Sequence, residues 1–232
     1  MEIKNIIYLF LSVVIGAIIV EIIRPKKSKN IQLLLTFSGA YLLAISVIHL
    51  LPELFHNQPK NTIGIFILLG FLLQIILEYF SKGIEHGHFH KPKFIPISVM
   101  MSLCLHSLIE GIPLGGGLEH NHSAHNALLN GVLLHKTPVS IVLFSIFLQS
   151  GMSKIKAYFL LFIFAIMAPL GLYFGYLFSE ISKYSNEIMA IIIGVFIHIS
   201  TTILFESNEG HKFSLSKIFA IIIGSIFAVL SI

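Results

Sequence analysis

The feature that most constrains this chain is a series of long apolar runs that fill it almost from end to end. Short polar segments separate eight such runs, which lie near residues 5–23, 33–56, 62–81, 95–116, 124–149, 154–178, 187–206 and 214–231. A helix needs about 20 apolar residues to cross the hydrocarbon core of a bilayer. The predicted fold class is therefore an all-α integral membrane protein with eight transmembrane helices.

Composition excludes the other broad classes. Only 11% of the 232 residues are charged and 56% are hydrophobic, whereas a soluble domain carries about 25% charged residues. Eight spans use up the chain, so residues 1–232 are expected to form a single transmembrane domain. The first run lacks a small-residue cleavage site after it and is interpreted as a retained span rather than a signal peptide.

The distribution of cations predicts the orientation of the chain in the membrane. Because the polar segments alternate between the two sides, one side receives eleven cations: Arg24, Lys26, Lys27, Lys29, Lys82, Lys91, Lys93, Lys154, Lys156, Lys212 and Lys217. The other side receives three: Lys4, Lys60 and Lys183. The positive-inside rule then places both termini outside, with the plasma (inner) membrane as the expected location. The net charge of +4 reflects this asymmetry and predicts no nucleic-acid partner.

Runs four and five contain the interruptions that mark transport sites. Gly111 and Pro113 interrupt run four, and Pro138 interrupts run five. Transporters commonly place their sites on such broken helices between two inverted repeats. We infer an inverted repeat of helices 1–3 and 6–8 around helices 4 and 5.

Two ionisable residues of run four share one helical face. His106 and Glu110 are four residues apart, so their side chains stack one above the other. Imidazole and carboxylate together suit a borderline divalent cation such as Zn²⁺. Both are costly in hydrocarbon unless they face a cavity or a partner. The alternative is that Glu110 simply pairs with an interior cation.

Run five adds a third candidate ligand, His135, and an ammonium group, Lys136, deep in a predicted span. Alone, either residue is as readily interpreted as a satisfied core residue. Together with His106 and Glu110, His135 completes a set of three ligands for a cation, and Lys136 would balance spare negative charge.

These motifs resemble those of a known family, the ZIP (Zrt/Irt-like) metal transporters. The segment His106-Ser-Leu-Ile-Glu110-Gly-Ile-Pro-Leu-Gly resembles the fourth helix of that family, and His135-Lys136-x-Pro138 resembles the start of its fifth-helix motif. In run two, His49-Leu-Leu-Pro-Glu53 resembles the second-helix motif. The span count and outside termini match as well, so the resemblance covers essentially the whole chain.

The resemblance implies a carrier that moves Zn²⁺, or a similar ion such as Fe²⁺, Mn²⁺ or Cd²⁺, from outside into the cytoplasm. It assigns His106, Glu110 and His135 to the primary metal site, with Ser107 beside them. Many members have Asn or Asp at Ser107, a carboxylate at Lys136 and another at Val139, which build a second metal site next to the first. Here Lys136 would place its charge there, so we expect one transport metal, not two.

Other polar residues are secondary candidates for metal binding. His49 and Glu53 are interpreted as pathway residues, with an interfacial cap as the alternative and a local backbone distortion expected at Pro52. Alternating histidines in the loop after run three indicate metal binding at a cytoplasmic exit, or else a solvated loop: His86, His88 and His90.

Three further polar residues lie in or near the later spans. His198 is interpreted either as a pathway residue or as a partner of a neighbouring helix, and Glu206 matches a carboxylate that the family often carries. Gln74 and Glu78 form another four-spaced pair, with Glu78 expected at the interface.

The same residues are compatible with two rival functions. An intramembrane metal-dependent hydrolase would also gather His and carboxylates on helices, but the chain has no His-Glu-x-x-His motif and no Asp. A metal sensor that binds without transport would show the same ligands. Small residues such as Gly64 and Gly70 allow a homodimer, so the expected partners are the metal ion, the lipid bilayer and a second copy of the chain.

Overall fold

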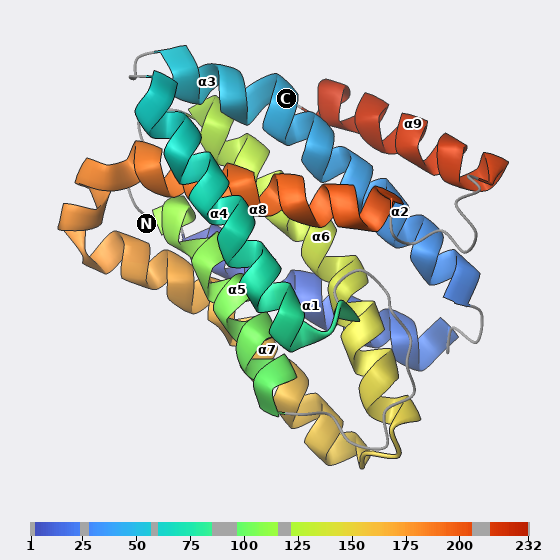
Figure 1. The fold of residues 1–232 in the computed structure, drawn as a ribbon. Coiled ribbons are helices and arrows are strands. Elements are labelled where there is room, and N and C mark those ends of the chain that lie inside the picture. The colour runs from blue at the N-terminus through green and yellow to red at the C-terminus, as the bar shows by residue number, and fades with distance from the viewer. Residues whose placement is uncertain are drawn as a thin grey trace.

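A computed structural model describes residues 3–23, 28–56, 60–84, 97–115, 122–205 and 214–231, and within these ranges the chain is helical and contains no strand (Figure 1). The long helices are α1 (Ile3–Ile23), α2 (Ser28–Ile45), α4 (Lys60–Ser81), α5 (Ile97–Gly115), α6 (His122–Gln149), α7 (Lys154–Leu177), α8 (Ser185–Phe205) and α9 (Leu215–Leu230). Three short elements complete them: η1 (Ser46–Leu50), α3 (Leu51–His56) and η4 (Ser179–Tyr184).

The helices confirm the predicted all-α membrane fold. Seven segments of the described chain are long and apolar enough to span a bilayer, with α2, η1 and α3 forming one continuous segment over Asn30–Phe55. The eighth apolar run forms α9, whose 16 residues make it shorter than the others. At 1.5 Å per residue α9 rises about 24 Å, compared with about 30 Å for the hydrocarbon core.

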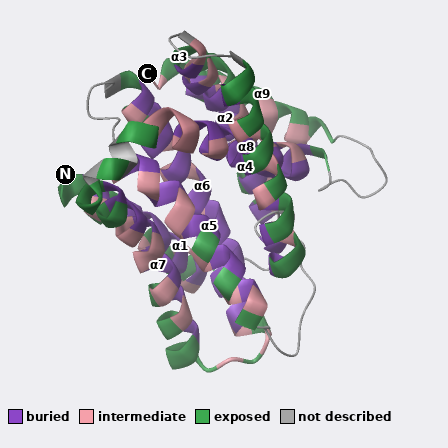
Figure 2. Ribbon diagram, turned by 60° about the vertical axis from the view of Figure 1, so that its left-hand side comes forward, coloured by how far each residue is buried: buried purple, intermediate pink, exposed green. Residues whose placement is uncertain are grey.

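Burial separates central helices from peripheral ones (Figure 2). In α6, 78% of the membrane-spanning window is buried, and in α8 72%, whereas α1 and α4 bury only 33% and 22%. The outer helices present large apolar side chains such as Ile18, Leu72 and Phe159 at the surface. Such a surface suits contact with lipid, because acyl chains solvate apolar side chains and water does not.

The most extensive helix contacts join α5 with α7, α4 with α8, α2 with α9, and α1 with α6. In chain order the eight predicted spans are α1, α2, α4, α5, α6, α7, α8 and α9. The inferred repeat exchanges spans 1–3 with spans 6–8, and span 4 with span 5. This exchange converts the α5–α7 pair into the α1–α6 pair, and the α4–α8 pair into the α2–α9 pair. An inverted repeat requires such a correspondence, which supports the repeat; the repeat itself stays a prediction.

Polar contacts fix the relative direction of the helices. At the start of α1, Asn5 bonds to His125 near the start of α6, with 3.0 Å between side-chain nitrogens. At the opposite end of α1, Glu21 pairs with Lys154 at the start of α7. Therefore α1 runs parallel to α6 and antiparallel to α7, as alternating membrane crossings require.

The expected backbone distortion near Pro52 is present. Proline lacks the N–H that would bond to the carbonyl of Ile48, and residues Ser46–Leu50 form a π-helical turn that ends two residues before it. This turn carries His49. Wide turns of this kind occur frequently at functional sites.

Glycine permits the close approach of α5 and α7. A Cβ added to Gly111 would collide with the carbonyl oxygen of Ala168, and one added to Gly171 would collide with that of Leu108. Gly70 meets the backbone of Ile191 in the same way, so its small size is used within the chain. A Cβ added to Gly64 would meet no atom of another element within 4 Å, so Gly64 remains available as a small surface residue.

We predict that Gly171→Ala lowers the melting temperature of the detergent-solubilised protein, because overpacking costs about 1–3 kcal/mol. Gly64→Ala is the matched control, since it adds a methyl group where no atom of another element lies within 4 Å. Size-exclusion chromatography after heating measures both. Equal melting temperatures for the two variants would contradict the close α5–α7 contact.

Candidate metal site

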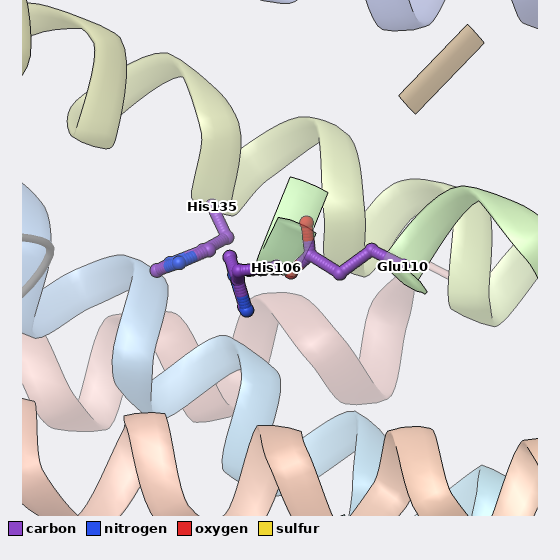
Figure 3. A group of neighbouring side chains, drawn as sticks. All are labelled: His106, Glu110 and His135. Atoms are coloured by element: carbon purple, nitrogen blue, oxygen red, sulfur yellow. Dashed lines mark ion pairs between the residues drawn. The ribbon is translucent and has the colours of Figure 1, made fainter. Parts of the chain in front are cut away.

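Two adjacent helices bring three of the predicted ligands together. His106 and Glu110 lie one turn apart on α5, and His135 projects from α6; their exposed fractions are 3%, 0% and 1%. One ligand atom from each residue lies within 4.8 Å of the other two (Figure 3). The two imidazole rings meet edge to face, with 6.3 Å between their centroids. The group is compact enough for all three side chains to reach one ion.

The contacts of His106 orient it for metal binding. Its Nδ1 lies 3.0 Å from Oε1 of Gln74, an α4 side chain with 0% exposure. An amide oxygen only accepts hydrogen bonds, so this contact places the imidazole proton on Nδ1. Nε2 of His106 then lies 3.0 Å from Oε1 of Glu110. Two such acceptors are held this close favourably only when a proton or a metal cation lies between them.

Lys136 occupies the other side of the carboxylate. Its Nζ donates to Oε2 of Glu110 at 2.9 Å and to Oγ of Ser107 at 2.8 Å, and it lies 5.3 Å from the centroid of the Phe164 ring. The alternative in which Glu110 pairs with an interior cation is thus realised at one carboxylate oxygen, while the other faces His106. Ser107 contacts the group through Lys136, and its role as a metal ligand stays a prediction.

The second-helix residues lie outside this group of three. His49 sits on the π-helical turn and is partly buried, and Glu53 is exposed on α3. Exposure of Glu53 agrees with the interfacial alternative, whereas Nε2 of His49 is buried. A pathway role for His49 and Glu53 stays a prediction.

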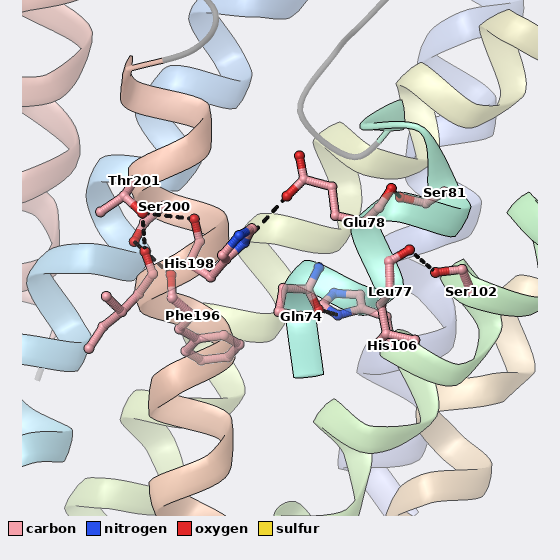
Figure 4. A network of polar contacts seen from close by, with 11 residues as sticks. Gln74, Leu77, Glu78, Ser81, Ser102, His106, Phe196, His198, Ser200 and Thr201 are labelled. Atoms are coloured by element: carbon pink, nitrogen blue, oxygen red, sulfur yellow. Dashed lines mark hydrogen bonds and ion pairs between the residues drawn. The ribbon is translucent and has the colours of Figure 1, made fainter. Parts of the chain in front are cut away.

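Helix α4 supplies two residues whose partners the sequence did not reveal (Figure 4). Gln74 holds His106, and Glu78, which we expected at the interface, places Oε2 3.4 Å from Nδ1 of His198 on α8. The four-residue spacing of Gln74 and Glu78 in the sequence indicates that they share one face of α4. It does not indicate which helices that face contacts. The remaining secondary candidates lie outside the described residues: His86, His88, His90 and Glu206.

The described residues thus define a polytopic helical membrane protein whose buried His–Glu–His group could hold a cation. Comparison with known families is more specific: the family model described as ZIP Zinc transporter matches residues 85–231, which include His106, Glu110 and His135. The chain belongs to this family and is a divalent metal transporter, in a family of transporters rather than enzymes. No curated protein matches the chain.

We predict that Lys136→Met destabilises the metal-free protein by about 3–5 kcal/mol, because it leaves the carboxylate of Glu110 buried beside one fewer partner. The control is Lys154→Met, whose partner Glu21 has a side chain that is 26% exposed. Exposed pairs contribute only about 0–1 kcal/mol.

Denaturation in the presence of a chelator compares the two variants, because added metal could replace the lost positive charge. The double variant Lys136→Met with Glu110→Gln should recover part of the loss. Equal stability of Lys136→Met and Lys154→Met would contradict the buried pair.

Proposed function

We propose that the protein takes up Zn²⁺ from outside the cell into the cytoplasm through the site between α5 and α6. The observation that carries the proposal is the convergence of His106, Glu110 and His135 within 4.8 Å in the buried interior of the bundle. Two imidazoles and a carboxylate form a donor set that Zn²⁺ accepts readily. Fe²⁺, Mn²⁺ and Cd²⁺ accept the same donors to different degrees.

Lys136 supports a single ion at this site. Its ammonium group already contacts Oε2 of Glu110 and Oγ of Ser107, which is the side of Glu110 where a second, adjacent ion would bind. A divalent cation there would meet a positive charge at close range. One ion is therefore held between Oε1 of Glu110 and the two imidazoles.

The direction of uptake follows from the proposed orientation in the inner membrane. The excess of cations in alternate polar segments places the start of α5 and the end of α4 on the cytoplasmic side. A partly dehydrated ion enters from the opposite side, exchanges water for the three ligands, and leaves toward the end of α4. Because these ligands bind metal only when deprotonated, uptake decreases as the pH is lowered.

We predict that His106→Ala and His135→Ala each reduce Zn²⁺ uptake by at least about 10- to 100-fold, the range seen when even the supporting partners of metal ligands are removed. Proteoliposomes that contain a zinc-responsive dye measure the flux. His125→Ala is the control, because His125 also lies on α6 but bonds to Asn5 instead.

Full uptake by both site variants would reject the site. A wild-type protein that binds Zn²⁺ but gives no flux would indicate a sensor instead of a carrier.

We predict that Gln74→Leu weakens Zn²⁺ binding by about 10- to 100-fold, as other changes behind a metal-bound histidine do. The leucine fills similar space but cannot accept the proton of His106 Nδ1. Direct binding measurements on purified protein test this, with Gln74→Glu as the variant that keeps an acceptor and restores binding. Wild-type affinity in Gln74→Leu would contradict an orienting role.

A further inference from the structure

A groove lies between α1 and α7, which pack side by side (Figure 2). Its volume is about 400 Å³, within the range of about 300–1,000 Å³ that small-molecule sites span. Buried Val13, Ala17 and Ala165 line it, and so do Ile18 and Phe162, which are half-exposed. Small residues on both helices thus leave a hollow that is open to the surface of the bundle.

Polar groups line the groove at one end only. Among the described residues that line it, only Glu21 and Tyr158 carry polar side-chain groups. Glu21 accepts hydrogen bonds from Nζ of Lys154 and from the hydroxyl of Tyr158, each at 3.0 Å. These three residues lie near the end of α1 and the start of α7. The groove is therefore amphipathic, with one polar end and an apolar remainder.

The length of the groove matches one leaflet of the bilayer. On α1 its lining runs from Phe10 to Ile22, which corresponds to about 18 Å at about 1.5 Å per residue. Half of the hydrocarbon core of a bilayer is about 15 Å deep. An acyl chain that enters at the polar end can therefore follow the groove through its own leaflet. No such match in length is required of a water-soluble ligand.

The polar end suits a phosphate group. Lys154 is the first residue of α7, and the side chain of Ser153 before it does not cap the helix. The N–H groups of a first helical turn attract anions. The ammonium group of Lys154 has three N–H donors, and its contact with Glu21 uses one of them. In the proposed orientation this end faces the cytoplasm, where the surplus of cations attracts anionic lipids.

We propose that the groove binds one anionic phospholipid. Its phosphate contacts Lys154 and the first turn of α7, and one acyl chain fills the groove between α1 and α7. Glu21 is a positioning residue, because its carboxylate holds Lys154 at the end of the groove. The site goes beyond the proposed uptake of Zn²⁺ and uses none of the three metal ligands, so it stands or falls independently of the metal site.

Two competing interpretations predict different results. If any lipid covers this surface, phospholipids with the same acyl chains bind equally whatever their headgroup. If a second copy of the chain covers it, the purified protein is a dimer that a bulky residue in the groove dissociates. The proposed site predicts selection by headgroup and loss of the lipid when the groove is filled.

The first test is native mass spectrometry of the purified full chain in an equimolar mixture of phosphatidylglycerol, phosphatidylethanolamine and phosphatidylcholine with identical acyl chains. Wild type should retain one phosphatidylglycerol in preference to the others. Lys154→Gln should lower this preference about fivefold, as expected for one lysine near an anionic lipid. Lys156→Gln is the matched control, because it removes an exposed lysine about 200° further around the same helix.

Glu21→Gln distinguishes the two charged parts of a headgroup. It should strengthen retention of phosphatidylglycerol, because it removes a negative charge beside the bound phosphate. Preferential retention of phosphatidylethanolamine, lost in Glu21→Gln, would show an ammonium group bound to Glu21 and would overturn the anionic assignment.

A second test fills the groove. Val14→Trp places a large ring among the lining residues and should abolish retention of the lipid, whereas Ile15→Trp adds the same ring at an exposed position outside the groove. Ala17→Leu is a smaller filling of the same space. Melting temperatures establish that each variant is folded. Equal retention of all three lipids by wild type, or wild-type retention in folded Val14→Trp and Ala17→Leu, would overturn the site. A dimer that these two variants dissociate would assign the groove to a second copy instead.

Discussion

The burial of one carboxylate inside the membrane governs the organisation of this protein. Glu110 is 0% exposed, and an isolated carboxylate in such surroundings is strongly disfavoured. The chain compensates for it from two sides, with Lys136 at one oxygen and His106 at the other. The two helices that carry these groups are therefore held in register by charge as well as by packing. An ion bound between Glu110 and His106 would join a network that is already arranged around a cation.

In the proposed function, Lys136 also affects which ions the site favours. Glu110 and Lys136 together carry no net charge, so a divalent cation is not attracted by a surplus of negative charge as it would be by several carboxylates. Its binding then depends on the two imidazole nitrogens of His106 and His135. Such donors favour zinc and other transition metals over Mg²⁺ and Ca²⁺, which prefer oxygen ligands. In the proposed function, Lys136 keeps the site mononuclear, and the imidazole nitrogens make it selective.

Much of this arrangement was predictable from the sequence because membrane helices are local structures. Apolar run 154–178 corresponds to α7 at Lys154–Leu177, and the four-residue spacing placed His106 and Glu110 on one face. The partners of Gln74 and Glu78 were not predictable, because helix periodicity says which face is polar but not which helix that face meets. The η1 turn was expected only as an unspecified distortion at Pro52. The short helix α9, in contrast, follows apolar run 214–231 to within one residue at each end.

The most direct measurement is zinc X-ray absorption spectroscopy on the purified protein loaded with less than one equivalent of Zn²⁺. The arrangement of His106, Glu110 and His135 predicts scattering from two imidazoles at about 2.0–2.1 Å, reduced to one in His135→Ala. A spectrum without imidazole scattering, or one that His135→Ala leaves unchanged, would contradict a metal site between α5 and α6.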